Sequence, residues 1–102
     1  MLKDFEIYRA ADARERRTFE KRGGKIVSFR VQLEVCVDNE WKAVKRWDTS
    51  HGFVDCDTYN LKGEKKKLIL NVSFEEGLVL AQKDFNEHWR RYRDSFLQGV
   101  FP

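Results

Sequence analysis

The sequence predicts an α+β fold: a four-stranded antiparallel β-meander with one long C-terminal helix packed across one face of the sheet. Residues 26–37 alternate between apolar and polar side chains, which is typical of a strand with one buried face. From residue 74 onward, apolar side chains recur at spacings of three and four, which is typical of an amphipathic helix. The 102 residues of the chain are expected to form a single domain.

The N-terminal segment, residues 1–24, is dense in charge, and we expect it to form a weakly docked helix. Residues 10–17 have high intrinsic helix propensity. The segment offers only a thin apolar stripe, so a helix here would dock weakly against the sheet. The pair Gly23-Gly24 is predicted to end it.

The predicted sheet spans residues 25–72, and the connection after its first strand sets the register. A three-residue loop over 38–40 would place Trp41, Ala43 and Trp47 on the buried face. A two-residue loop would reverse every side chain, because the side-chain period of a strand is two. We prefer the first register because it buries both tryptophans, although Lys45 then has to reach out from the buried side. The strands are predicted at residues 26–37, 41–48, 53–59 and 65–72.

The C-terminal helix is predicted over residues 73–98. Ser73 and Glu76 form a capping box, in which the serine accepts a hydrogen bond from the amide of Glu76 and the glutamate reaches back. Gly99 is placed to stop the helix. A helix of this length, rising about 1.5 Å per residue, is long enough to cross the sheet. Its apolar stripe consists of Phe74, Leu78, Ala81, Phe85, Trp89, Tyr92 and Phe96.

The run from Arg46 to Asp57 concentrates reactive side chains around a predicted hairpin turn at residues 50–52. Arg46 and Asp48 share one face of a strand, as do Asp55 and Asp57 on the next. Pairing of the two strands would bring opposite side chains within about 5 Å of one another. This hairpin is therefore the candidate site.

Three kinds of chemistry fit the hairpin. Its carboxylates and imidazole could hold a divalent cation such as Mg or Mn, His51 with an aspartate could act as an acid–base pair, and Arg46 suits a phosphate oxygen. The alternative is structural, with a cross-strand ion pair and a turn that needs His51-Gly52. The candidate catalytic residues are Arg46, Asp48, His51 and Asp57, and the candidate metal ligands are Asp48, His51, Asp55 and Asp57.

The formal net charge of +3 is too small to indicate nucleic-acid binding by itself. Two clusters of basic residues could nevertheless attract a phosphate backbone. The alternative is a solvated face or a sheet edge that lysines protect from aggregation. The candidate nucleic-acid-binding residues are Arg14, Arg16, Arg17, Lys65, Lys66 and Lys67.

The two cysteines, Cys36 and Cys56, belong to no metal-binding pattern, and we expect two buried or half-buried thiols. No stretch of about 18 apolar residues is present, and the N-terminus lacks the apolar run of a signal peptide. We therefore expect a cytoplasmic protein that does not contact a membrane. No cofactor other than a divalent cation is expected. A homodimer through the polar sheet face is one hypothesis for partners, and a protein encoded nearby is another.

The run Trp41–Asp57 and the aromatic, arginine-rich segment 85–93 resemble a family of short prokaryotic proteins that is known only as a domain of unknown function. More distantly, the strand with Arg46 and Asp48 and the following histidine are similar to the TumE-type toxins of toxin–antitoxin pairs. Where that resemblance would imply a further histidine, this chain has Asp55. The resemblance implies a functional role for Arg46, Asp48, His51 and Asp57 and no particular substrate.

Three functions follow as hypotheses. The first is a binding or interaction module. The second is a metal-dependent phosphodiester enzyme or RNA-acting toxin that uses the hairpin of residues 46–57. The third is a basic nucleic-acid-binding accessory protein.

Overall fold

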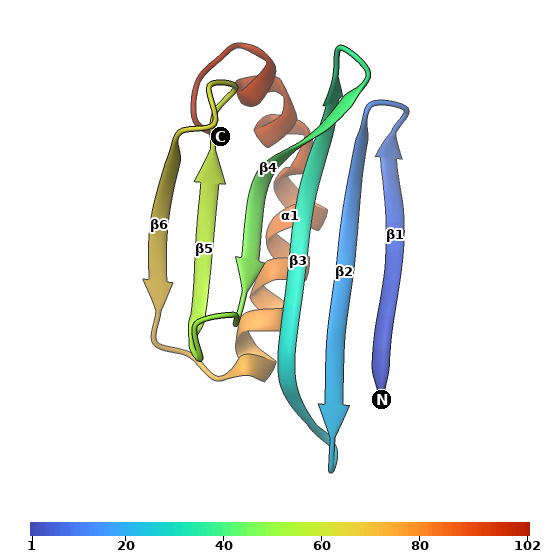
Figure 1. Cartoon of the computed structure of the whole chain (residues 1–102), viewed down its shortest axis with the longest axis vertical. Coiled ribbons are helices and arrows are strands. Elements are labelled where there is room, and N and C mark those ends of the chain that lie inside the picture. The colour runs from blue at the N-terminus through green and yellow to red at the C-terminus, as the bar shows by residue number, and fades with distance from the viewer.

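The computed structural model describes residues 1–102 as one antiparallel sheet with a single helix against one of its faces (Figure 1). The sheet has six strands, which follow one another in space in chain order. The prediction of a four-stranded sheet with an N-terminal helical segment is therefore wrong, although the last four strands and the helix are where the sequence places them. The elements are β1 (Leu2–Ala10), β2 (Ala13–Arg22), β3 (Lys25–Val37), β4 (Glu40–Asp48), β5 (Val54–Tyr59), β6 (Lys65–Leu70) and α1 (Phe74–Leu97).

The N-terminal segment forms a β-hairpin because both of its strands find a partner. β2 pairs with β3 along nearly its whole length, so the intrinsic helix propensity of residues 10–17 is overridden by sheet hydrogen bonds. Gly23 and Gly24 do not end a helix. Their φ angles of 55° and 76° belong to the two-residue turn that joins β2 to β3, in which both central residues need positive φ.

The strand alternation of this hairpin is hidden in the sequence because its inward positions carry charge. Glu15 is fully buried and forms ion pairs with Arg9 and Arg17, and both arginines donate to the side-chain oxygen of Asn86 in α1. A polar network therefore fills the space between the β1–β2 hairpin and the helix. Apolar side chains at these inward positions would have produced the alternation by which strands are predicted.

A two-residue turn and a β-bulge together set the register of β3 and β4. Asp38 and Asn39 have φ angles of 52° and 65°, so the predicted three-residue loop is wrong. The pairing shifts between Leu33 and Glu34, which lie opposite Lys45 and Ala43. The two-residue turn reverses the faces that the three-residue loop would have given, and the shift restores them for the rest of β4. Trp47 and Lys45 therefore face the helix as expected. Trp41 and Ala43 lie on the opposite face, against the prediction.

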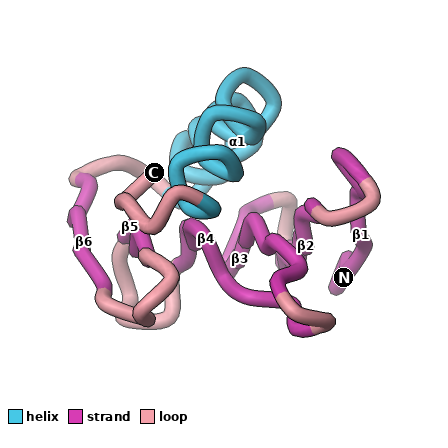
Figure 2. The backbone as a smooth tube through the Cα atoms, turned by 90° about the horizontal axis from the view of Figure 1, so that it is seen from above, coloured by secondary structure: helices cyan, strands magenta, loops and turns pink.

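α1 begins after Ser73, the predicted N-cap, and lies over the middle strands of the sheet (Figure 2). Of the two bonds of the predicted capping box, only the one that Ser73 accepts is formed. Ser73 Oγ accepts a hydrogen bond from the amide of Glu76 at 3.1 Å. The carboxylate of Glu75 accepts from the amide of Ile26 at 2.8 Å, which ties the first turn of the helix to β3. The predicted stripe is the contact face, and its buried members are Leu78, Ala81, Phe85, Tyr92 and Phe96.

Lys45 does not reach out of the interface but is paired within it. Its ammonium lies 2.8 Å from Asp84 Oδ2 and donates to Tyr92 Oη at 3.1 Å. Trp47 Nε1 and the Tyr92 hydroxyl also donate to the Asp84 carboxylate, at 3.1 and 2.5 Å. Burial alone would lower the pKa of Lys45, but the bonds to Asp84 and Tyr92 outweigh it and raise that pKa above its ordinary value.

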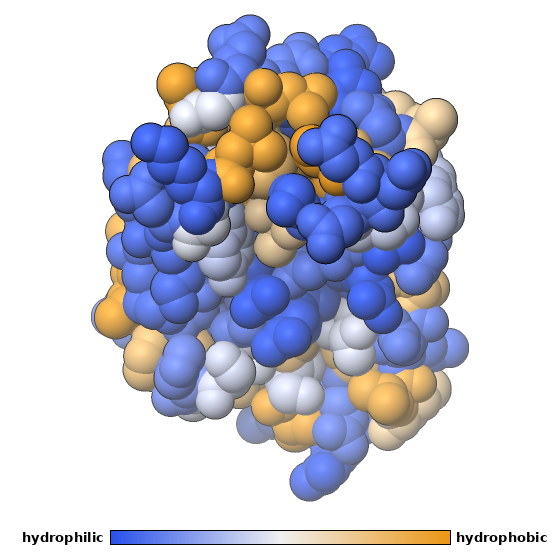
Figure 3. All heavy atoms as spheres, turned by 45° about the horizontal axis from the view of Figure 1, so that its top comes forward, coloured by the Kyte–Doolittle hydropathy of each residue, from blue (hydrophilic) through white to orange (hydrophobic).

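The surface seen with the top of Figure 1 turned forward is mainly hydrophilic, with hydrophobic residues gathered in separate patches (Figure 3). The chain has no helix that is both long and apolar enough to cross a membrane.

Candidate functional site

The sheet face away from α1, called the open face below, carries the candidate site. The pairing of all six strands defines rows of side chains that cross this face. The prediction that Arg46 and Asp48 share a face with Asp57 and Asp55 is confirmed, because Arg46 pairs with Asp57 and Asp48 with Asp55. One row contains Glu6, Arg16, Gln32, Arg46, Asp57 and Lys67, and the next contains Asp4, Thr18, Arg30, Asp48, Asp55 and Ile69.

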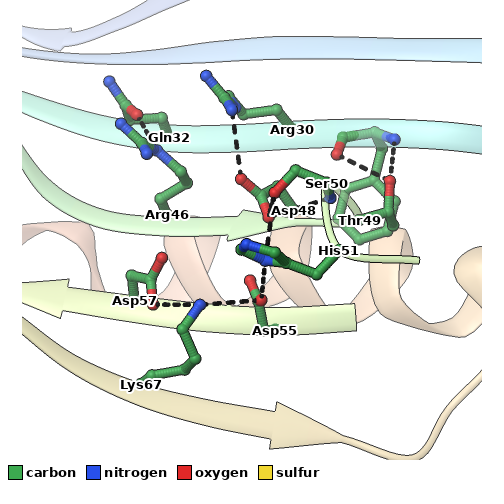
Figure 4. A network of polar contacts seen from close by, with 11 residues as sticks. Arg30, Gln32, Arg46, Asp48, Thr49, Ser50, His51, Asp55, Asp57 and Lys67 are labelled. Atoms are coloured by element: carbon green, nitrogen blue, oxygen red, sulfur yellow. Dashed lines mark hydrogen bonds and ion pairs between the residues drawn. The ribbon is translucent and has the colours of Figure 1, made fainter. Parts of the chain in front are cut away.

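The three aspartates of the hairpin, Asp48, Asp55 and Asp57, are buried beside longer cationic side chains from the neighbouring strands (Figure 4). The side chain of Asp55 is 1% exposed, yet its Oδ2 lies 3.0 Å from Lys67 Nζ and 3.1 Å from His51 Nδ1. Burial would raise the pKa of Asp55. The hydrogen bonds from Lys67 and His51 outweigh that cost and hold the pKa below its usual value.

Lys67 bridges two carboxylates, because its ammonium also lies 3.2 Å from Oδ1 of Asp57. Oδ1 of Asp55 and Oδ1 of Asp57 are buried and accept no hydrogen bond of good geometry. The ammonium thus stands between the two aspartates at ion-pair distance. No group of three or more His, Cys, Asp or Glu side chains is placed so that it could hold a metal ion.

Asp48 anchors the turn between β4 and β5. Its Oδ1 accepts from the Ser50 hydroxyl at 3.1 Å, while its Oδ2 lies 3.4 Å from a guanidinium nitrogen of Arg30. Thr49 is bound to the backbone of Phe29, whose amide donates to Thr49 Oγ1 at 3.0 Å. The structural role that the sequence suggests for this turn is therefore present beside the ion pairs.

Two adjoining hollows open on this face. The first, called the arginine hollow, has a volume of about 190 Å³ and no hydrophobic lining residue. The second, called the hydroxyl hollow, has a volume of about 360 Å³ and shares Thr18 and Arg30 with the first. The arginine hollow is lined by Arg16, Thr18, Arg30, Gln32 and Arg46, and the hydroxyl hollow by Thr18, Ser28, Phe29, Arg30, Asp48, Thr49 and Ser50.

The three arginines of the hollow keep most of their hydrogen-bonding capacity. Arg46 Nε donates to the Gln32 side chain at 2.6 Å. Arg30 and Arg16 lie no closer than 3.4 and 3.7 Å to a carboxylate oxygen, of Asp48 and Glu6 respectively. Each guanidinium has five N–H donors, so none of the three is saturated by its partner.

The basic residues singled out in the sequence divide between the two faces. Arg14, Arg16, Lys65 and Lys67 lie on the open face. Arg17 faces the helix and is buried against Glu15, and Lys66 lies over the ring of Phe101 at 4.3 Å.

An aromatic cluster at one end of the open face escaped the sequence analysis. The rings of Tyr8 and Trp41 meet edge to face with centroids 6.1 Å apart, and the Arg14 guanidinium lies 4.1 Å from the centroid of the Trp41 ring. Arg30 was missed as a site residue as well. The alternation of residues 26–37 places Arg30 on the polar face of its strand. The sequence does not show which residues of the neighbouring strands form a hollow with it.

These features define a small α+β protein with a six-stranded antiparallel meander, a helix over one face and an ion-paired, arginine-rich open face. A family model described as a domain of unknown function, DUF7718, matches residues 2–102, and the chain belongs to that family. No curated protein matches the chain. No solved structure matches it either.

Proposed function

We propose that this protein is a binding module that holds a phosphate-bearing ligand in the arginine hollow of its open face. The observation that supports this most is the convergence of Arg16, Arg30 and Arg46, from three neighbouring strands, on one polar hollow. Guanidinium groups bind phosphate oxygens through paired, charge-assisted hydrogen bonds.

The greater exposure of the arginines than of Asp48 favours the binding of an anion. The side chains of Arg30 and Arg16 are 51% and 49% exposed, whereas that of Asp48 is 5% exposed. A ligand approaching from solvent therefore meets the guanidinium groups first. The buried Asp48 carboxylate lies 3.4 Å from Arg30 and holds it in place, as the buried Asp55 and Asp57 do for the partly exposed Lys67.

The test is a thermal shift with inorganic pyrophosphate, with sodium chloride at matched ionic strength as the reference. A ligand at about ten times its Kd adds about 1.4 kcal/mol by mass action, which raises the melting temperature of a domain of this size by several degrees. The double variant Arg30→Gln/Arg46→Gln should lose the rise. Arg22→Gln is the matched control, because Arg22 is an exposed arginine paired only with Glu20 outside the hollow.

Two results would contradict the proposal. One is a melting temperature that pyrophosphate leaves unchanged in the unaltered protein. The other is a rise of equal size in the double variant and in Arg22→Gln, since the arginine hollow would then contribute nothing.

A second function, acid–base catalysis on the bound ligand, is favoured by one specific contact. The imidazole of His51 is largely exposed, and its Nδ1 lies 3.1 Å from the buried carboxylate of Asp55. A carboxylate at Nδ1 orients the ring, fixes the tautomer that carries a proton on Nδ1 and leaves Nε2 as the base. The ring also stacks on Phe53 at a centroid distance of 6.0 Å.

This second function predicts turnover of a phosphodiester substrate by the unaltered protein and its loss in His51→Gln. The substrate in the assay is a fluorogenic bis-aryl phosphodiester, followed across the pH range. If the rate in His51→Gln equals that of the unaltered protein, or if no turnover is measured, the protein binds without catalysis by this pair.

A further inference from the structure

We infer that the ligand of the arginine hollow is a single-stranded nucleic acid, whose phosphates bind the arginines and whose bases stack on the aromatic cluster of Tyr8 and Trp41. This inference rests on the proposed function and names the class of its ligand. The supporting observation is that the cluster, the arginine hollow and the hydroxyl hollow follow one another on the same face of the sheet.

The length of this track favours a chain over a small molecule. Trp41 lies opposite Cys36 in β3, and Ser28 of the hydroxyl hollow lies eight residues earlier in the same strand. At about 3.4 Å per residue, the track is roughly 27 Å long. A single phosphate group fills only the arginine hollow, whereas several nucleotides in a row would reach from the aromatic cluster to Ser28.

The aromatic cluster adds a surface on which the rings of bases can stack. Tyr8 is 60% exposed at the end of the edge strand β1. Trp41 is half-buried and carries the Arg14 guanidinium at 4.1 Å from its ring centroid. Arg14 is held there by Glu34, whose Oε1 accepts from Arg14 Nε at 2.6 Å. Aromatic rings beside an arginine-lined groove are the usual platform for unpaired bases.

The same geometry disfavours a duplex. The bases of a duplex are stacked on one another, so Tyr8 could not reach a base face without breaking the stack. Thr18, Gln32 and Ser28 add uncharged donors and acceptors along the track. Such groups suit sugar hydroxyls and base edges as well as phosphate oxygens.

The experiment measures binding of fluorescein-labelled single-stranded RNA and DNA of mixed sequence by fluorescence anisotropy, with the corresponding duplexes alongside. Tyr8→Ala should weaken single-strand binding about 5- to 140-fold, the range expected for loss of one stacked base. Tyr8→Phe keeps the ring and should retain binding close to that of the unaltered protein. The matched control is Phe5→Ala, since Phe5 pairs with the helix-facing Arg17 and lies on the other face of the same strand.

Salt dependence gives a second, independent measurement. Each phosphate contact to a single strand adds about −0.7 to the slope of log K against log salt. Arg30→Gln should make the slope shallower by about that amount, whereas Tyr8→Ala should weaken binding at an unchanged slope. Equal slopes for the two variants would contradict the assignment of phosphates to the arginines and bases to the ring.

Failure of this inference is distinguishable from failure of the proposed function. If pyrophosphate stabilises the protein but neither single strand binds, or if duplexes bind equally well, the inferred ligand class is wrong. The proposed phosphate site in the arginine hollow would still be supported. Binding that Tyr8→Ala and Phe5→Ala weaken equally overturns the base platform. Binding of a phosphoserine peptide in place of either nucleic acid overturns the inference as well. If pyrophosphate does not bind either, the proposed function fails with it.

Discussion

Replacing Gly77 by alanine should destabilise the protein, although the same change in a free helix would stabilise it. Gly77 lies in the first turns of α1, against Val54 of β5 and Phe29 of β3. A Cβ built there would lie 2.7 Å from Cγ2 and 3.0 Å from Cγ1 of Val54, and 3.2 Å from Cζ of Phe29. Non-bonded carbon atoms prefer separations of about 3.5–4.0 Å, so the helix or Val54 would have to move by nearly 1 Å.

Two opposing contributions decide whether Gly77→Ala raises or lowers the free energy of unfolding. Alanine gains at most about 1 kcal/mol over glycine from helix propensity. Overpacking a well-filled core costs about 1–3 kcal/mol, and Val54 is fully buried and β-branched, so it cannot swing away at little cost. The first turn is also held by the bond from the Ile26 amide to Glu75. We expect a net loss of about 1 kcal/mol or more, a drop in melting temperature of about 4–8 °C for each kcal/mol.

The assay is urea unfolding of Gly77→Ala and of Val54→Ala, alone and combined. Val54→Ala alone should cost about 1–3 kcal/mol through lost burial and a cavity. In the Val54→Ala background the obstructing methyl groups are gone, so Gly77→Ala should be neutral or stabilising. The reasoning is refuted if Gly77→Ala stabilises the unaltered protein, or if it costs the same free energy in both backgrounds.

Three further predictions concern buried groups. Asp84→Asn should cost about 3 kcal/mol because it leaves the Lys45 ammonium buried without a counter-charge. The double variant Lys45→Met/Asp84→Asn removes that ammonium and keeps an acceptor for Trp47 and Tyr92, so it should recover most of that loss in urea unfolding. A double variant no more stable than Asp84→Asn would contradict the pairing. The pKa of Asp55 is held below its unfolded value of about 3.8, so its contribution to stability is present above pH 4 and is lost as the pH falls through its folded pKa. Asp55→Asn should flatten acid unfolding curves in that window, and an unchanged slope would count against it. Burial raises the pKa of the Cys56 thiol to about 12, so a thiol reagent at pH 8 should titrate Cys36 alone in the native protein and both thiols in denaturant; rapid modification of two thiols in the native state would be inconsistent with this burial.

The helix and the last four strands could be predicted because local chemistry decides them. Ser73 caps the helix whatever it packs against, and the alternation of residues 26–37 is unambiguous. The N-terminal hairpin could not be predicted from the same rules. Its inward positions carry Arg9, Glu15 and Arg17, which satisfy one another and Asn86 only once the helix is in place.

The candidate site was predicted in part. That Arg46, Asp48, Asp55 and Asp57 share a face follows from the two-residue period and one hairpin. That Lys67 neutralises two of them depends on β6, which pairs with β5. Neither the hairpin of residues 46–57 nor the segment of β6 has a sequence pattern that predicts this contact.

The sequence by itself determined the local elements of this protein: a capped amphipathic helix, an alternating central strand and a polar hairpin with three aspartates. Only the tertiary structure decided which residues meet on the open face. Arg16, Arg30 and Arg46 come from three strands and are brought together by register, which depends on two two-residue turns, at 23–24 and 38–39, and on one register shift in each of the two strand pairings. A change of one residue in any of them reverses every side chain that follows it, so the faces are known only after all of them are placed.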